Sequence, residues 1–126
     1  MKRFISLFFM FTTIVVTMHA DNGSAAAINL EYQGHDDHIE FYAPADMPEA
    51  YFDSDEMEII IEADGFADYY VVNIISQVSM QCVIYTQISG YGDTIDVSSL
   101  PDGYYRLVIT SSNNNVFEGY FMIETE

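Results

Sequence analysis

Apolar and polar residues alternate with a period of two along most of this chain, as in β-strands that bury one face. The pattern is clearest at 55–63, where one face holds Met57, Ile59 and Ile61 and the other holds three glutamates and Ile60. We find no stretch with the 3.6-residue period of an amphipathic helix. The predicted strands are 28–32, 55–63, 69–75, 80–86, 95–97, 104–109 and 117–123.

Turn residues separate these stretches, among them Pro101-Asp102-Gly103 and Asp64-Gly65. About seven short strands joined by such turns predict an all-β fold, an immunoglobulin-like Greek-key β-sandwich, because two sheets can each bury one face against the other. A small barrel is the alternative. Residues 43–54 hold two of the three prolines and are predicted to connect the sheets. Residues 39–42 are apolar and of uncertain type, with an edge strand as one interpretation.

The chain begins like an exported protein. Met1-Lys2-Arg3 precedes an apolar run at 4–18, which has the length of a signal-peptide core and falls short of the ~20 residues that a membrane span needs. We expect a signal peptide at 1–26, cleaved after Ala20 or Ala26, and one domain at 27–126. The product is then periplasmic or extracellular, with no membrane span left; a retained anchor is the alternative.

The charge of the chain is strongly negative. Once Lys2 and Arg3 leave with the signal peptide, Arg106 is the only Lys or Arg left against twenty Asp and Glu, or nineteen if cleavage after Ala26 also removes Asp21. Such a domain repels phosphate backbones and anionic lipids, which excludes nucleic acid as a partner. The acids either form a solvated surface or attract cations or a basic protein.

The C-terminal third carries a resemblance to a known family. Gly103, Tyr105, Leu107 and Ile109 form a G-x-Y-x-L-x-I motif, and 119–123 (GYFMI) follows it as the returning strand. With these motifs the chain resembles the small exported proteins of unknown function from gut Bacteroidetes that carry an Ig-like sandwich. The resemblance implies a fold and an exported location, and it implies no catalytic residues.

One sheet face is the strongest functional candidate. In an Ig-like fold the third strand pairs with the sixth and the sixth with the seventh, so the outward residues of these strands share one face. We expect a contiguous apolar and aromatic surface there, with the cation near its middle. Its candidate residues are Tyr69, Val71, Tyr104, Arg106, Val108, Tyr120 and Met122.

Three interpretations of this face remain open. It contacts a protein partner or a second copy, since Tyr, Met and Arg are enriched at interfaces. Its tyrosines stack on sugar rings, which makes the domain a carbohydrate-binding module. Or the N-terminal segment around Tyr32 and Phe41 covers it.

Other chemistry is weakly indicated. Cys82 shares strand parity with Ile84, which predicts a buried, unreactive thiol. Residues 53–56 resemble the start of a calcium loop, but Glu58 stands where glycine is required, so we favour a solvated acidic loop. His35 and His38 are spaced for opposite faces of a strand and fit a polar turn better than a metal site. With no enzyme motif, we expect a non-catalytic module without metal or cofactor.

Overall fold

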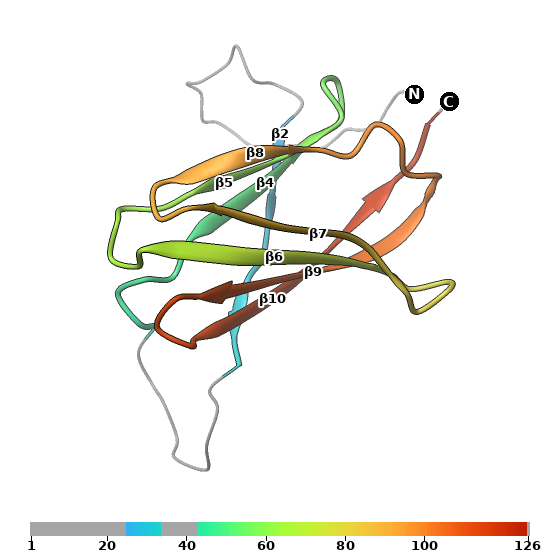
Figure 1. Ribbon diagram of the computed structural model, residues 1–126. Helices are drawn as coiled ribbons and strands as arrows, with labels where there is room; N and C mark the ends of the chain where they lie inside the picture. The colour runs from blue at the N-terminus through green and yellow to red at the C-terminus, as the bar shows by residue number, and fades with distance from the viewer. Residues whose placement is uncertain (1–24, 34–42, 126) are drawn as a thin grey trace.

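The computed structural model describes residues 25–33 and 43–125, which form nine β-strands (Figure 1). Within this described part, no helix is long and apolar enough to cross a membrane. The strands are β2 (Ala25–Ile28), β3 (Glu31–Tyr32), β4 (Glu49–Asp53), β5 (Glu58–Glu62), β6 (Tyr69–Ser76), β7 (Cys82–Ser89), β8 (Gly92–Asp96), β9 (Gly103–Ser111) and β10 (Val116–Ile123).

The strands form two antiparallel sheets that pack face to face. One has five strands in the order β3-β10-β9-β6-β7, and the other has four in the order β2-β4-β5-β8. After the N-terminal strands, the chain passes from one sheet to the other between β5 and β6, between β7 and β8, and between β8 and β9 (Figure 1). This is the Ig-like sandwich expected from the alternating pattern, and the barrel alternative is wrong.

The core lies between the sheets and follows strand parity. The inward-facing apolar side chains of β6, β9 and β10 are each 5% exposed or less: Tyr70, Val72, Ile74, Tyr105, Leu107, Ile109, Phe117, Phe121 and Ile123. The Tyr105 hydroxyl donates a hydrogen bond to the backbone carbonyl of Pro101, four residues upstream. This contact ties the turn before β9 to the core, as a tyrosine corner does in Ig-like domains.

Two parts of the N-terminal half differ from the prediction. The segment 43–54, expected to be a connection, contains β4, which lies between β2 and β5. Its strand character was hidden because only Ala50 and Phe52 face the core, and alanine adds little to an alternating pattern. The predicted strand 28–32 is instead two strands, with β2 in one sheet and β3 beside β10 in the other.

Gly119 on β10 makes this crossing possible. A Cβ at Gly119 would lie 2.7 Å from Cγ2 of Ile28 and 2.8 Å from the backbone oxygen of Asn29. The link between β2 and β3 therefore packs directly on the β10 backbone, at a position where only glycine leaves enough room.

Candidate functional site

The seven candidate residues all lie on what we call the outer face, the side of the five-stranded sheet that points away from the other sheet. Met122 is 51% exposed, Tyr104 and Tyr120 are 47% each, and Tyr69 is 40%. Val71 and Val108 are partly buried between neighbouring strands. Strand parity thus predicted the orientation of these side chains correctly.

The structure does not bring all seven together. Tyr104 lies opposite Met122 at one end of β9, and Tyr120 lies opposite the next outward residue, Arg106. At the other end of the sheet, the carbonyl of Tyr69 accepts a hydrogen bond from the amide of Ser112. Eight residues of extended chain separate 104 from 112, about 26 Å at 3.3 Å per residue. Tyr69 and Val71 therefore belong to a different region of the face.

Tyr104, Tyr120 and Met122 form a compact group that we call the tyrosine patch. The two rings are stacked, with centroids 5.6 Å apart and an interplanar angle of 11°. The turn between β6 and β7 borders the patch, since the Gln77 amide donates a hydrogen bond to the Tyr104 carbonyl over 2.9 Å. The next residue of that turn, Val78, is 83% exposed. The turn thus adds an exposed apolar residue at this end of the sheet.

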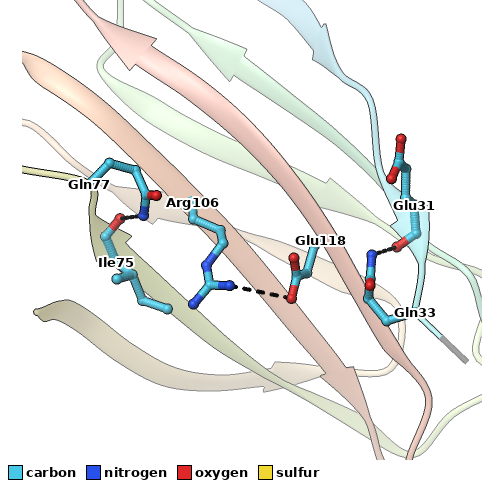
Figure 2. A network of polar contacts seen from close by, with 6 residues as sticks. All are labelled: Glu31, Gln33, Ile75, Gln77, Arg106 and Glu118. Atoms are coloured by element: carbon cyan, nitrogen blue, oxygen red, sulfur yellow. Dashed lines mark hydrogen bonds and ion pairs between the residues drawn. The ribbon is translucent and has the colours of Figure 1, made fainter. Parts of the chain in front are cut away.

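Arg106, the cation expected near the middle of the face, forms an ion pair within the sheet. Its Nη1 lies 3.6 Å from Oε2 of Glu118 on the neighbouring strand, as Figure 2 shows. The side chain of Arg106 is 32% exposed, and its Nε is buried without a hydrogen-bond partner in the described part of the chain. The positive charge of Arg106 is therefore offset by the carboxylate of Glu118.

Polar residues divide the outer face into two regions. One row across the sheet runs from Asn73 on β6 through Val108 to Glu118 and Glu31. Beside the row, the Gln33 side chain donates a hydrogen bond to the Glu31 carbonyl over 3.4 Å (Figure 2). The continuous apolar face expected from the sequence is interrupted here, because alternation predicts which way a side chain points but not what lies beside it.

Residues 25–33 leave the tyrosine patch uncovered. β3 extends the sheet beside β10, and the Tyr32 ring packs against Phe117 on the core side, with centroids 5.8 Å apart. Whether the following segment covers the face stays untested. That segment, 34–42, lies outside the described residues together with His35 and His38.

Sequence reasoning missed a buried polar cluster at the far end of the sandwich. Asp46 is 4% exposed, and its carboxylate accepts hydrogen bonds from Nδ2 of Asn113 at 3.0 Å and of Asn115 at 3.1 Å. Its backbone carbonyl accepts the Tyr70 hydroxyl at 2.6 Å. Burial, followed by the negative charges of Asp46 and Asp64, raises the pKa of Tyr70. The cluster ties the 43–48 segment to the β9–β10 turn, and no local motif signals it because its members are up to 69 residues apart.

Cys82 is an exposed free thiol, so the prediction of a buried one was wrong. The β6–β7 register shifts between Ile74 and Ile75, which moves Cys82 to the outer side of the sheet. Its Sγ lies 3.4 Å from Oδ1 of Asn73 and 3.3 Å from the Ile84 carbonyl. A β-bulge of this kind reverses strand parity, and the alternating pattern cannot reveal it.

The acidic loop at 53–56 is built as a turn. Oδ1 of Asp53 accepts the backbone amides of Asp55 at 3.0 Å and of Glu56 at 3.2 Å, which caps the connection between β4 and β5. Among residues 25–33 and 43–125, His, Cys, Asp and Glu side chains nowhere form a group of three or more that could hold a metal ion.

Comparison with known proteins identifies the fold. No protein-family model and no curated protein matches the chain. A crystal structure of a DUF3244 family protein from Bacteroides vulgatus, described as having an immunoglobulin-like β-sandwich fold, matches with a TM-score of 0.62. The match covers 79% of this chain and 99% of that chain at 17% identity, which shows a shared fold. The fold implied by the resemblance to Ig-like Bacteroidetes proteins is therefore confirmed.

Proposed function

We propose that this protein is a non-catalytic, exported Ig-like module that binds a protein partner through the tyrosine patch. The observation that supports this most is the stacked pair Tyr104–Tyr120 beside Met122, each about half exposed on a rigid sheet. Tyr and Met are enriched at protein interfaces, and a ring pair already held in place loses little conformational freedom on binding.

The partner's chemistry follows from the charges around the patch. Glu118 lies on β10, Asp102 in the turn before β9, and Glu124 directly after β10. Within the described part of the chain, the ion pair of Arg106 is with Glu118. The full chain has a formal net charge of −17. A protein surface with an apolar centre and a basic rim complements this arrangement, and opposite charges would also speed the encounter. We expect binding to weaken as salt concentration rises.

Carbohydrate binding is the second candidate, and ring geometry favours it less. A sugar platform needs aromatic faces that are open to solvent. At 5.6 Å and 11°, Tyr104 and Tyr120 instead turn a face toward each other. Asn73 and Gln77 supply polar groups nearby, so glycan binding is kept as an outcome of the test below.

A photo-crosslinking amino acid at position 120 tests the proposal in the cells that naturally produce the chain. The matched control carries the same amino acid at Tyr91, which is 73% exposed on the turn between β7 and β8. We expect a protein adduct from position 120 that disappears with Tyr104→Ser and is absent from position 91. Equal adducts from both positions, or none from either, would refute a partner at the patch.

A glycan array probed with the purified chain and with its Tyr104→Ser/Tyr120→Ser variant separates the second candidate. Because both rings are half exposed, the variant should fold, which circular dichroism checks. If the purified chain binds a glycan that the variant does not bind, and the crosslinking experiment gives no protein adduct, carbohydrate recognition is the function of the patch instead of protein binding.

A further inference from the structure

β7 forms one edge of the five-stranded sheet (Figure 1). Among the described strands it pairs with β6 alone, so one side of its eight-residue backbone carries hydrogen-bonding groups without a strand partner there. Tyr85, near the middle of β7, is 71% exposed, and Val83 is 40% exposed. This edge is long and rich in β-branched and aromatic residues.

The hairpin that contains β7 carries no charge. Residues 69–92, which span β6, β7 and both adjoining turns, contain no Asp, Glu, Lys, Arg or His, although 18% of the chain is charged. Six of the ten exposed large hydrophobic residues in the described part lie in this charge-free stretch: Tyr69, Val78, Met80, Val83, Tyr85 and Tyr91.

The other described edges have the protection that β7 lacks. Natural edge strands are usually short or carry charges, prolines or bulges that prevent pairing with another chain. β8 is an edge of the four-stranded sheet and carries Asp93 and Asp96, β2 has four residues, and β3 has two, one of them Glu31. In β7 the register shift between Cys82 and Ile84 disturbs one end only, which leaves 84–89 in regular pairing with β6.

We propose that β7 pairs antiparallel with β7 of a second copy of this chain. A second copy is favoured over another partner because the edge is neutral in a protein of net charge −17. Two such molecules repel each other wherever their acids meet, and a basic partner would be drawn to the acids rather than to this edge. An antiparallel strand pair also has two-fold symmetry, so a strand can be its own partner in an isologous dimer.

The pairing would join the two five-stranded sheets into one continuous sheet. Its two-fold axis stands perpendicular to that sheet, so both outer faces look to the same side. If the proposed function holds, the dimer displays two tyrosine patches on the same face, separated by β6 and β7 of both copies, and gains avidity for a partner with repeated sites. The dimer itself rests on β7 alone and does not depend on that function.

Sedimentation equilibrium of the protein, purified from cells that express the full chain, tests the dimer. We expect a dimer that Tyr85→Glu/Gln87→Glu weakens at least tenfold in Kd, because this variant places like charges across the axis. The control Tyr91→Glu makes one of these Tyr-to-Glu changes at a residue of similar exposure outside β7, 73% against 71% for Tyr85, and should leave the dimer intact. The dimer should bind more tightly at 0.5 M than at 0.05 M NaCl, because salt screens the repulsion between flanking acids such as Asp93. The Debye length falls from ~14 Å to ~4 Å over this range.

Three results would overturn the proposal. They are a monomer up to ~100 μM, a dimer that the β7 double variant leaves unchanged, and a dimer that Tyr104→Ser/Tyr120→Ser dissociates. The first two leave the tyrosine patch and its crosslinking test unaffected, so failure of the dimer and failure of the proposed function can be told apart.

The single cysteine allows a second measurement without any substitution. A spin label on Cys82 sits near one end of β7, with its side chain on the outer face and not in the strand edge. Antiparallel pairing about Tyr85 or Thr86 separates the two labels by six to eight residues, on the order of 20–30 Å with the lateral strand spacing. Pulsed electron paramagnetic resonance should show this distance. No interspin distance, or one beyond ~50 Å, contradicts the pairing whether or not the variants fold.

Discussion

The buried cluster around Asp46 supports the most quantitative prediction, the effect of Asp46→Ala on stability. The substitution removes a carboxylate that accepts hydrogen bonds from Asn113 and Asn115. It leaves the backbone carbonyl that accepts the Tyr70 hydroxyl, so the change isolates the side chain. The 43–48 segment then loses these side-chain hydrogen bonds to the β9–β10 turn.

The magnitude follows from the two amide donors. Hydrogen bonds to a charged group contribute about 1.5–3 kcal/mol each. Asn115 is partly buried and Asn113 is exposed, so water can accept hydrogen bonds from both side-chain amides and replace part of the lost interaction with Asp46. We therefore expect Asp46→Ala to lower the free energy of unfolding by about 2–4 kcal/mol. Asp46→Asn keeps the shape but turns one acceptor into a donor, and it should cost about half as much.

Urea unfolding followed by tyrosine fluorescence measures the loss, since the chain contains no tryptophan. Protein concentration must be held constant, because a dimer makes apparent stability depend on it. The control is Asp64→Ala, an exposed aspartate that also lies near Tyr70 and should cost less than about 0.5 kcal/mol. If Asp46→Ala costs no more than this control, the cluster is not the structural tie that its geometry suggests.

Two further predictions concern packing and pH. Gly119→Ala should lower the free energy of unfolding by about 1–3 kcal/mol in the same urea assay, because the added Cβ would lie 2.7 Å from Ile28 and 2.8 Å from the Asn29 carbonyl. An unchanged urea midpoint would show that the link between β2 and β3 can shift to make room. Burial, a 2.9 Å hydrogen bond to Glu49 and nearby carboxylates raise the pKa of Tyr51 to about 12. The folded state thus holds this proton more tightly than the unfolded state, so the stabilisation is complete below pH ~10 and is lost as pH rises toward 12. Melting temperatures measured from pH 9 to 12 should fall less steeply in Tyr51→Phe, and equal slopes would contradict the assignment.

Much of the fold could be predicted from local patterns. A strand alternates its side chains whatever it pairs with, so apolar residues at every second position predicted both the strands and their buried sides. This explains why Tyr105 and Leu107 were expected in the core and Tyr104 and Arg106 on the outer face, as the structure shows. Turn residues such as Pro101 and Gly103 marked where strands end for an equally local reason.

Contacts between distant segments could not be predicted in this way. Asp46 meets Asn115 only after both sheets have formed, and β4 is recognisable as a strand by its partners rather than by its own sequence. The exposure of Cys82 depends on a register shift with β6. In each case the outcome depends on contacts between residues that are distant in the sequence, and the local alternation of apolar and polar residues contains no information about such contacts.

The candidate site shows the same division. By itself the sequence determined that Tyr104, Tyr120 and Met122 point to the outside, because backbone geometry links side-chain direction to position along a strand. Only the tertiary structure decided that these three lie together, that Tyr69 lies far from them, and that Glu118 neutralises Arg106. Strand register and sheet order decide which residues become neighbours, and both are set by packing of the whole domain.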